Sequence, residues 1–582
     1  MWSEIFIEQL VQHGIKYACI SPGSRSAPLT YSLAKNKNIK CCINIDERSS
    51  AFFALGLAKA SSSPVVIVTT SGTATAELYP AIIEAFQQRS PLIVCTADRP
   101  PELKNSGTNQ MINQKNIYRN HIRWFKDAGL PELTENKLFR LVLITHKAIN
   151  IAAKKDKGPV HLNFPFRKPL EPGSFTDEID ESIIVLINKM KLASRESPTA
   201  VIKKRDRKII SKIASRIFTS QRGLIVAGPQ DYNPKVIKAI NSLSEITGFP
   251  VLADGASQLR FNSSNNLVIS NYDAYLRSEI FIQKFRPDVI LQFGRTVTST
   301  FLENYFEESE IDRFLINEYG DRFDPSGKAK SIVKFNPEIF CDELIKYLKE
   351  INFKKPSKEW SKIFHTADMF AEEIKSKIIY NSSFPNEARI IPELIKIIPS
   401  KSSIVVGNSL PIRDLEFFTT ASNKGLKIFF NRGASGIDGI TSTALGIAKH
   451  NKSAVLITGD LSFLHDINAL LAANKNPVSL VIVLINNNGG GIFDMLPIKE
   501  YGELFRKYFK TPHDRNIKSI VEAFGHNHIQ IESWNHLAES VITSMQKKSL
   551  TVLEIKTNSI SSHKLREKYW NLVKEKINSE FS

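Results

Sequence analysis

The chain has few cysteines, no long apolar run and no leader-like N-terminus. Its 5 cysteines form an odd set without a C-x-x-C pair, which argues against a disulfide framework and against a structural zinc site. The strongly apolar run from Leu480 to Ile485 is far too short to span a bilayer. No basic segment precedes a small-residue cleavage site near Met1. We therefore expect a protein of the reducing cytoplasm without a membrane span.

Nucleic-acid-binding motifs are also missing, although 77 Lys and Arg against 59 Asp and Glu give a formal net charge of +18. The basic residues are scattered, without interleaved aromatic residues and without an RNP, zinc-finger or helix-turn-helix pattern. A solvated surface together with sites for acidic substrates accounts better for this charge. We therefore expect no nucleic-acid partner.

What the chain does contain is a repeated strand-loop-helix rhythm over 582 residues, a length that predicts about three or four domains. Residues 1–180 and 385–582 alternate short β-rich runs with helical patterns, which indicates parallel sheets covered on both faces. Residues 195–355 read as a further α/β domain with neither G-x-G-x-x-G nor a P-loop, so we assign it no nucleotide. Residues 171–200 and about 346–386 are predicted to contain linkers and one connecting helix. The predicted fold class is α/β, with three doubly wound parallel-sheet domains.

Loops rich in Ser, Gly, Asp and Arg follow the first four predicted strands. Ligands of doubly wound sheets bind beyond the carboxyl ends of the strands, so these loops form one candidate rim. The strands are predicted at 16–20, 40–45, 65–69, 92–96 and 160–163, then at 223–228, 250–253 and 288–293, and finally at 404–406, 427–430, 454–458, 480–485 and 551–555.

The strongest local pattern places Asp460 after one predicted strand and Asn487 after the next, with a predicted helix over 462–474 between them. A strand-helix-strand unit brings both side chains to the same rim of neighbouring parallel strands. A carboxylate, an amide oxygen and a freed backbone carbonyl suit Mg²⁺, whose shell is completed by phosphate oxygens and water. Glycines 489–491 let the backbone approach a ligand closely, and the helix N-terminus favours negative charge. Each motif alone is more often a turn or a helix cap, but their joint spacing predicts a magnesium-diphosphate clamp.

This interval resembles the cofactor motif of the thiamine-diphosphate-dependent enzyme family, which runs from Gly-Asp to Asn-Asn. The resemblance implies bound thiamine diphosphate with Mg²⁺ or Mn²⁺, the cation held by Asp460, Asn487 and the carbonyl of Gly489. Leu461 is a departure, because the family more often has glycine there. Ile492 resembles the bulky apolar residue that props the cofactor in its bent conformation. Further cofactor contacts are implied for Gln110, Gly459, Leu461, Ser462, Phe493 and Leu496.

The family also needs a glutamate from its N-terminal domain, and Glu47, at the end of the second predicted strand, occupies that place. A carboxyl that shares a proton with the aminopyrimidine ring promotes the imino tautomer, and burial beside the ring would raise its pKa. Alternatively, Glu47 merely begins a helix and favours its dipole. In the family, the domains that carry Glu47 and Asp460 come from different subunits. The resemblance therefore implies a homodimer or homotetramer with active sites between subunits.

Longer strings resemble one branch of this family, transferases that decarboxylate 2-oxoglutarate and add the succinyl carbanion to isochorismate in menaquinone and phylloquinone synthesis. These strings are Ile20–Leu29, Thr96–Leu103, Gly107–Gln110, Gly407–Ser409 and Asn431–Gly439. Both substrates are anionic, and a planar guanidinium suits a carboxylate, although a single arginine is more often a structural salt bridge. The substrate contacts implied are Arg25, Arg99, Arg413 and Arg432, with Ser24, Asn109, Gln110 and Ser409 as neutral hydrogen-bonding groups.

The middle domain departs from this branch, which commonly carries a basic residue shortly after a strand that ends in glycine. Here Gly294-Arg295 is followed by no Lys or Arg after Thr298, which leaves a substrate contact from this domain open. Two other functions also stay open. A carboligase of the acetohydroxyacid-synthase type would share Glu47, Asp460 and Asn487 but not the arginine-rich strings, and a non-catalytic homologue would use the fold for binding alone.

Overall fold

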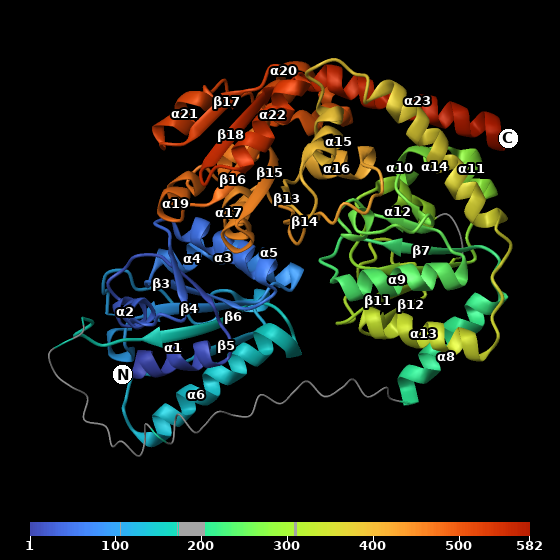
Figure 1. The fold of residues 1–582 in the computed structure, drawn as a ribbon. Helices are drawn as coiled ribbons and strands as arrows, with labels where there is room; N and C mark the ends of the chain where they lie inside the picture. The colour runs from blue at the N-terminus through green and yellow to red at the C-terminus, as the bar shows by residue number, and fades with distance from the viewer. Residues whose placement is uncertain (105, 172, 174–184, 186–203, 308–310) are drawn as a thin grey trace.

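The computed structural model describes residues 1–104, 106–171, 173, 185, 204–307 and 311–582. Within these residues the strands form three six-stranded parallel sheets, and Figure 1 shows the three domains in blue, green and orange to red. The first and third sheets have the same strand order, β2-β1-β3-β4-β6-β5 and β14-β13-β15-β16-β18-β17. The middle sheet has the order β12-β11-β10-β7-β8-β9. The predicted fold class is confirmed, while most of the predicted linker at 171–200 lies outside the described residues.

The N-terminal domain buries its central strands completely. In Val65–Thr69 every residue is buried, as expected for a parallel sheet with helices on both faces. The edge strand Trp124–Asp127 was not predicted, because its residues are only half-buried and carry no continuous apolar run. The strands are β1 Tyr17–Ile20, β2 Lys40–Ile43, β3 Val65–Thr69, β4 Leu92–Asp98, β5 Trp124–Asp127 and β6 Val160–Pro165, and the helices are α1 Trp2–Gln12, α2 Ala27–Lys35, α3 Glu47–Ser61, α4 Thr73–Glu77, α5 Tyr79–Gln88 and α6 Glu135–Asn150.

The middle domain contains the three predicted strands and three more that the sequence did not indicate, β9, β11 and β12. Helix α13 packs against α8 and α9 within this domain, and the long helix α14 that follows packs against α23 (Ser559–Phe581) of the third domain. The strands are β7 Gly223–Ala227, β8 Val251–Ala253, β9 Val268–Ile269, β10 Val289–Phe293, β11 Asp312–Asn317 and β12 Ser331–Lys334, and the helices are α8 Lys204–Thr219, α9 Pro234–Thr247, α10 Tyr272–Tyr275, α11 Glu279–Lys284, α12 Thr300–Glu307, α13 Pro337–Glu350 and α14 Glu359–Ile378.

The C-terminal domain begins with helix α15 at Glu387 and contains all five predicted strands together with the edge strand β17. Its strands are β13 Ser403–Val406, β14 Lys427–Phe430, β15 Ser453–Gly459, β16 Ser479–Asn486, β17 Asn527–Gln530 and β18 Leu550–Lys556. Its helices are α15 Glu387–Ile397, α16 Leu410–Phe418, α17 Ile440–Asn451, α18 Asp460–His465, α19 Ala469–Lys475, α20 Gly502–Phe505, α21 Ile517–Ala523, α22 Trp534–Met545 and α23 Ser559–Phe581.

The single helix predicted over 462–474 was wrong, because the chain forms two helices, α18 and α19, and the first already begins at Asp460. The break follows from Asp466. Its buried carboxylate accepts hydrogen bonds from the amide of Ser442, at 2.7 Å, and from the hydroxyl of Ser442, at 3.0 Å. This side chain therefore satisfies donors in the first turn of α17 at the point where the predicted helix is interrupted.

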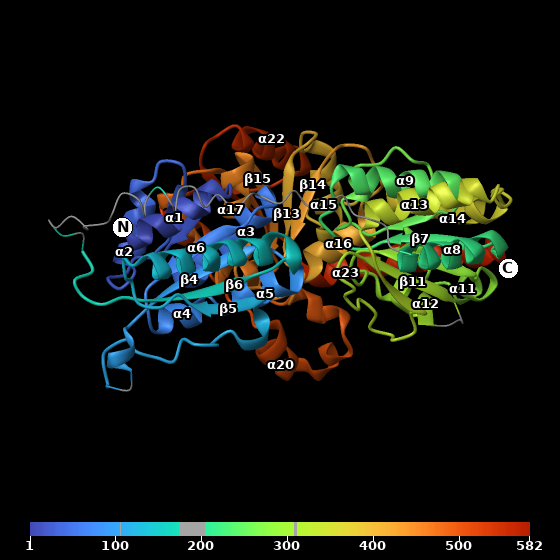
Figure 2. The same ribbon diagram turned by 90° about the horizontal axis from the view of Figure 1, so that it is seen from below.

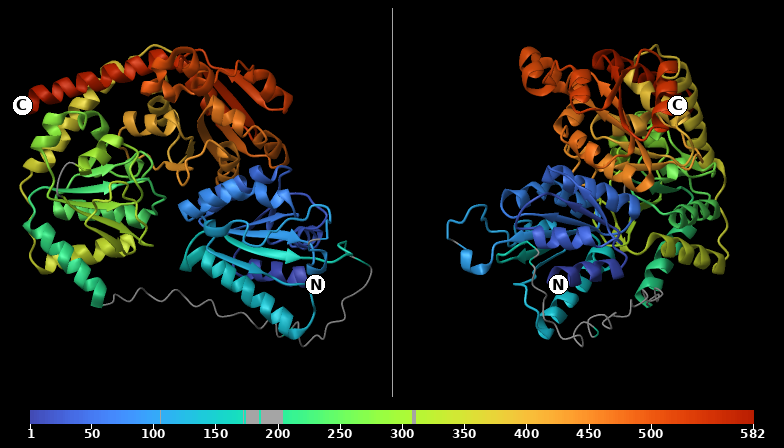
Figure 3. Two further views of the ribbon diagram at one scale, coloured as in Figure 1. Left: turned by 180° about the vertical axis from the view of Figure 1, so that it is seen from behind. Right: turned by 60° about the vertical axis from the view of Figure 1, so that its left-hand side comes forward.

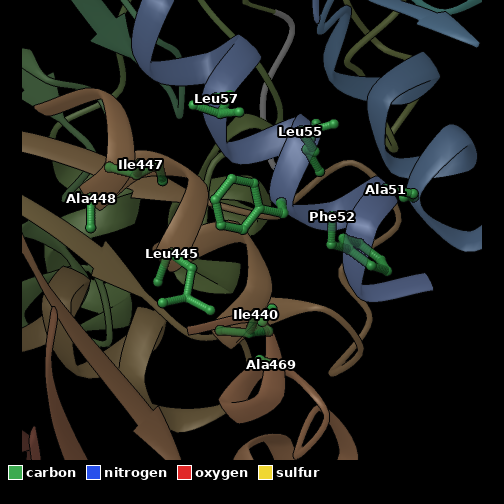
Figure 4. Packing of buried hydrophobic residues seen from close by; sticks show 14 of the residues in the cluster. Ala51, Phe52, Leu55, Leu57, Ile440, Leu445, Ile447, Ala448 and Ala469 are labelled. Carbon is green, nitrogen blue, oxygen red and sulfur yellow. The ribbon is translucent and has the colours of Figure 1, made fainter. Parts of the chain in front are cut away.

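Helices α3 and α17 join the N-terminal and C-terminal domains across one continuous apolar core. Figure 4 shows Phe52 and Leu57 of α3 in one apolar cluster with Leu445 and Ile447 of α17. All of these side chains are buried, so this contact contributes to the hydrophobic stabilisation of both domains.

Helix α23 runs from the C-terminal domain across to the middle domain, as Figures 1 and 3 show from opposite sides. Its Tyr569 and Trp570 belong to the apolar cluster that includes Phe418 of α16 and Phe364 of α14. The guanidinium of Arg277 lies 3.7 Å from the ring centroid of Trp570, a cation-π contact between the two domains. None of the described helices is both long and apolar enough to cross a membrane.

Candidate active site

Asp460 and Asn487 lie at the carboxyl edge of the third sheet. Strands β15 and β16 are adjacent and parallel, with Gly459 opposite Ile485, so both side chains follow directly after neighbouring strand ends. Asp460 is 2% exposed and its carboxylate accepts hydrogen bonds from the amides of Gly489, at 2.9 Å, and Leu461, at 2.7 Å. The predicted strand-helix-strand unit therefore brings these residues together.

Asn487 has an orphaned oxygen that suits a cation. Its amide nitrogen donates to Glu387 Oε1 at 2.9 Å, while its Oδ1 is buried without a hydrogen-bond partner among the described residues. Burial raises the pKa of Asp460, although the two backbone amides oppose the shift. A divalent cation beside both oxygens would satisfy the orphaned acceptor and stabilise the charged carboxylate. The residues present therefore fit a Mg²⁺ or Mn²⁺ site.

The described residues contain no group of three or more His, Cys, Asp or Glu side chains arranged to hold a metal ion. This agrees with a site that takes one carboxylate, one amide and one carbonyl from the protein and its remaining oxygens from a diphosphate. The carbonyl of Gly489 accepts from the amide of Gly491 at 2.9 Å and keeps a second lone pair for a cation. Gly491 also leaves room for Asn487, because a Cβ at Gly491 would lie 2.4 Å from the Asn487 amide nitrogen.

Residues 510–514, which no sequence motif had marked, cover the glycine loop at 489–491. The amide of Gly490 donates to the carbonyl of Lys510 at 2.7 Å, and the amides of His513 and Asp514 donate to Asn488 Oδ1. His513 Nε2 lies 3.3 Å from Asp460 Oδ2. Gly489 has φ +139°, and a Cβ there would lie 2.2 Å from the Lys510 carbonyl oxygen. The glycine loop therefore packs directly beneath this segment.

The apolar residues assigned to the cofactor follow this loop. Ile492 and Phe493 are half-buried, and Leu496 is exposed. At the N-terminus of α18, Gly459 faces open space, because a Cβ there would meet nothing within 4 Å. Leu461 is half-buried and Ser462 is buried in the first turns of this helix.

Glu47 is the first residue of α3 and is half-buried. Burial raises the pKa of this carboxyl, the nearby charges of Asp46 and Glu77 raise it further, and its own backbone amide lowers it. A raised pKa favours the protonated form, which is the state that can share a proton with a ring nitrogen. Asp46 caps the helix by accepting from the amide of Ser49 at 2.8 Å.

The residues on both sides of Glu47 bind the C-terminal domain of the same chain. Asn468 donates to Asp46 at 2.7 Å, and Arg48 donates to the carbonyl of His465 at 3.1 Å. Among the described residues no hydrogen bond or ion pair joins Glu47 to Asp460. The start of α3 is therefore held against the residues that follow α18, and among the described residues Glu47 forms no hydrogen bond or ion pair with the predicted cation ligands of its own chain.

Arg25 and Arg99 form a buried cationic pair in the N-terminal domain, 8% and 6% exposed. Burial and the positive charge of Arg99 lower the pKa of Arg25, while Asp98 opposes the shift. Arg25 donates to the carbonyl of Phe166 at 2.8 Å, and Arg99 donates to Ser71 and to Gln110. Neither forms an ion pair within the described part of the chain. The other predicted contacts of this rim, Ser24, Asn109 and Gln110, are exposed.

A second cationic pair lies in the C-terminal domain. Burial and the charge of Arg432 lower the pKa of Arg413, while Asp414 opposes the shift. Arg413 donates to the carbonyl of Ser409 at 2.8 Å, one turn earlier at the start of α16. Neither arginine has an acidic ion-pair partner among the described residues. The structure thus supplies two arginine pairs, one in each domain, that form no ion pair among the described residues.

Arg295 does not join either pair. Its guanidinium lies 4.8 Å from the ring centroid of Phe323 and donates to the carbonyl of Gln87 in the N-terminal domain. It lines a cavity of about 360 Å³ between these two domains, together with Arg89 and Lys59. No basic side chain of the middle domain forms a hydrogen bond or ion pair with the predicted substrate residues in the described structure.

Three family models match successive parts of the chain, in the same order as the three sheets. Residues 2–117 match the thiamine pyrophosphate enzyme N-terminal TPP binding domain, residues 193–406 match the middle domain of thiamine pyrophosphate enzymes, and residues 421–555 match the C-terminal TPP binding domain. The cofactor inferred from the clamp is therefore confirmed as thiamine diphosphate.

Curated relatives resolve the branch of the family. The 2-succinyl-5-enolpyruvyl-6-hydroxy-3-cyclohexene-1-carboxylate synthase of Geobacillus kaustophilus is 37% identical over 581 residues, covering 99% of this chain and 98% of the relative. The chain belongs to this synthase family. Synthases of the same name from Bacillus cytotoxicus, 35% identical, and Listeria monocytogenes, 36% identical, each cover 97% of this chain and 95% and 96% of their own lengths.

Solved structures confirm the fold of this synthase family member. Benzoylformate decarboxylase from Polynucleobacter necessarius superposes with a TM-score of 0.71 at 16% identity, covering 96% of this chain and 98% of that one. A putative thiamin diphosphate-dependent enzyme from Mycobacterium smegmatis gives a TM-score of 0.69 at 17% identity, covering 96% and 99%. At these identities the likeness concerns the fold alone.

Proposed function

We propose that the chain decarboxylates 2-oxoglutarate and adds the remaining succinyl unit to isochorismate, which yields 2-succinyl-5-enolpyruvyl-6-hydroxy-3-cyclohexene-1-carboxylate and CO₂ for menaquinone or phylloquinone synthesis. The observation that carries this proposal is the presence of two arginine pairs, Arg25 with Arg99 and Arg413 with Arg432, in which one guanidinium lowers the pKa of the other. Each substrate has two carboxylates, and guanidinium groups that form no ion pair among the described residues are suited to bind them. The full-length relatives of the same name support this assignment.

Asp460, Asn487 and the carbonyl of Gly489 would hold the divalent cation and through it the diphosphate. Bound thiamine diphosphate supplies the nucleophilic carbon and the electron sink. Glu47 would keep a proton in contact with the aminopyrimidine ring, a role for which its raised pKa is suited. The protein otherwise contributes orientation and electrostatics.

The arginines would bind the carboxylates of the substrates, and the apolar side chains would line the site beside the cofactor. Arg413 and Arg432, on the same domain as the clamp, are suited to bind carboxylates beside the cofactor, with Ser409 as a neutral partner. Ile492, Phe493 and Leu496 offer an apolar wall, and an apolar surrounding favours the loss of CO₂ from a charged carboxylate. Arg25 and Arg99, with Ser24, Asn109 and Gln110, are suited to bind the second anionic group.

We further propose a homodimer or homotetramer in which Glu47 of one subunit meets the clamp of another. Support comes from the described residues of one chain, in which no hydrogen bond or ion pair joins Glu47 to Asp460. The segment around α20 projects from the molecule in Figure 2. Leu496, Tyr501, Leu504 and Tyr508 are 46%, 64%, 52% and 64% exposed, and such a patch is typical of a subunit contact. Sedimentation of the Tyr501→Asp variant should show dissociation; an unchanged assembly would argue against this contact.

The proposed domain bounds are 1–180, 195–355 and 385–582, and the three sheets lie inside them. A cytoplasmic location is proposed because the cysteines, Cys19, Cys41, Cys42, Cys95 and Cys341, are all free thiols in the structure.

The deciding experiment incubates the purified chain with thiamine diphosphate, Mg²⁺, 2-oxoglutarate and isochorismate. Mass spectrometry should detect the adduct together with an equal amount of CO₂. A parallel reaction with pyruvate tests the acetohydroxyacid-synthase alternative: consumption of pyruvate without consumption of 2-oxoglutarate would reject our substrate assignment. Cofactor binding without turnover of any of the three would indicate a non-catalytic homologue.

A further inference from the structure

Glu387 lies directly behind the proposed cation ligand Asn487. It begins α15, is 1% exposed, and its Oε1 accepts hydrogen bonds from Asn487 Nδ2 and Thr557 Oγ1, both at 2.9 Å. Its Oε2 accepts from Arg566 Nη2 at 3.2 Å. Both oxygens of the buried carboxylate therefore accept hydrogen bonds, and Oε1 is the acceptor for the amide of Asn487.

An ionised carboxylate accepts hydrogen bonds and donates none. Of the two ends of the Asn487 amide, only the nitrogen can therefore face Glu387, and the oxygen must point the other way. That oxygen, Oδ1, is the buried atom without a partner among the described residues. Hydrogen-bond chemistry thus settles the orientation of an amide whose two ends are nearly alike in shape.

Arg566 of α23 fixes Glu387 in turn. Its guanidinium donates to Asp414 through Nε at 3.0 Å and through Nη2 at 2.6 Å, and all three side chains are 1% exposed. Two carboxylates thus share one guanidinium in the interior. A buried ion-paired group of this kind is costly to break from one side, which makes it a rigid support. Asp414 also lies next to Arg413 on α16, so the same arginine braces the helix that carries a proposed substrate contact.

We propose that Glu387 is the positioning residue of the cation site: it turns the Asn487 oxygen toward the metal, and Arg566 holds it in place. The negative charge of Glu387 also polarises the Asn487 amide, which makes its oxygen a stronger ligand for a divalent cation. Groups that orient a metal ligand from behind commonly change metal affinity by about 10–100-fold when replaced. This inference rests on the proposed ligand set of Asp460, Asn487 and Gly489.

The test measures cation affinity and not turnover. Mg²⁺ is titrated into the full-length apoprotein at saturating thiamine diphosphate by calorimetry, and Mn²⁺ binding is followed by EPR. Glu387→Gln should raise the Kd for both cations by about 10–100-fold, because glutamine can also donate and so no longer selects one amide orientation. An unchanged Kd in this variant overturns the proposal.

A stability-matched control separates positioning from general weakening of the fold. Asp414→Asn removes the other carboxylate from Arg566 without touching Asn487, so it should lower the melting temperature as Glu387→Gln does. Its Kd for Mg²⁺ should stay close to that of the wild type. Equal losses of cation affinity in both variants would indicate a purely structural role for Glu387 and reject the proposal.

A second variant keeps the proposal testable even where Glu387→Gln fails to fold. Aspartate is ordinarily a good Mg²⁺ ligand, yet Asn487→Asp should bind Mg²⁺ more weakly, because the new carboxylate faces Glu387. The double variant Glu387→Gln/Asn487→Asp should recover affinity, since the glutamine amide can donate to the aspartate. Tighter Mg²⁺ binding by Asn487→Asp alone would contradict the proposal.

Asp460→Ala distinguishes this inference from the ligand set on which it rests. If Asp460→Ala binds Mg²⁺ as the wild type does, the proposed ligands themselves are wrong. If Asp460→Ala loses the cation while Glu387→Gln keeps it, only the positioning role of Glu387 is rejected.

Discussion

Gly56 of α3 and Gly446 of α17 lie where these two helices cross at backbone distance. A Cβ on Gly56 would lie 2.0 Å from the carbonyl oxygen of Thr443, and a Cβ on Gly446 would lie 2.1 Å from the carbonyl oxygen of Phe53. No heavier residue fits at either position unless the helices move apart. Because these helices connect the domain of Glu47 with the domain of the clamp, the two glycines set the distance between them.

Gly56→Ala should therefore destabilise the protein, although alanine is the better helix former by about 1 kcal/mol. The overlap with a backbone carbonyl outweighs this gain, and overpacking of a core costs about 1–3 kcal/mol. Thermal unfolding should show a lower midpoint than the wild type. Ser215→Ala on the exposed face of α8 serves as the control and should leave the midpoint nearly unchanged. A midpoint at or above that of the wild type for Gly56→Ala would show that the helices separate easily.

Asp460→Ala should abolish Mg²⁺-dependent binding of thiamine diphosphate, because it removes the one carboxylate of the proposed ligand set. Calorimetry with and without Mg²⁺ measures this directly. Asp342→Ala, an exposed acid on α13, controls for loss of a negative charge and should bind the cofactor normally. If Asp460→Ala still binds thiamine diphosphate in a Mg²⁺-dependent way, Asp460 is not a ligand of the cation.

Glu47→Gln should bind thiamine diphosphate with nearly unchanged affinity and lose most of the turnover. Glutamine keeps the shape of the side chain but cannot share an acidic proton with the ring, and a general acid-base group contributes about 10²–10⁴-fold to rate. The cofactor Kd and kcat are measured on the same preparation. Turnover equal to that of the wild type would reject the catalytic role of Glu47 and indicate that it only begins helix α3.

Arg413→Ala should lower kcat/KM by about 10–100-fold, the equivalent of the roughly 1.5–3 kcal/mol that a hydrogen bond to a charged group contributes. The assay varies 2-oxoglutarate and isochorismate separately, so the substrate whose KM rises is the one that Arg413 binds. Arg322→Ala, an exposed arginine of the middle domain, is the matched control. Equal kcat/KM values in Arg413→Ala and Arg322→Ala would show that Arg413 does not bind a substrate.

Asp466 should make stability depend on pH. Burial raises the pKa of this carboxyl from 3.8 to about 7, although hydrogen bonds from Ser442 oppose the shift. The folded protein therefore holds the proton more tightly than the unfolded chain, and this stabilisation is present below about pH 4 and is lost as the pH rises to about 7. A tenfold difference in proton affinity between the folded and unfolded states corresponds to about 1.4 kcal/mol.

The variant Asp466→Asn carries no such proton. Its melting temperature relative to the wild type should therefore rise steadily between pH 5 and 7, and level off above that range. Asp342→Asn provides the comparison for an exposed carboxyl. A difference between Asp466→Asn and wild type that stays constant with pH would show that Asp466 is ionised throughout.

Much of the fold was predictable because each central strand is a short apolar run that ends in a polar loop. Val65–Thr69 and Val289–Phe293 are fully buried, and continuous burial appears directly in the sequence. The edge strands at Trp124–Asp127 and Asn527–Gln530 were missed, since they are half-exposed and carry no such run. The helix predicted over 462–474 was wrong because the break at Asp466 depends on Ser442, which lies in another helix.

The sequence by itself determined that Asp460 and Asn487 meet at one edge of the sheet, because each follows a strand and adjacent parallel strands end at the same edge. It also placed Arg25, Arg99 and Arg432 in loops, whereas Arg413 lies in the first turn of α16. Only the tertiary structure decided what surrounds them: Glu387 behind Asn487, Arg566 behind Glu387, and the contact between α3 and α17. These partners lie far apart along the chain, and a hydrogen bond between such side chains leaves no periodic pattern in either segment. They become neighbours only when the packed sheets and helices bring them to one place.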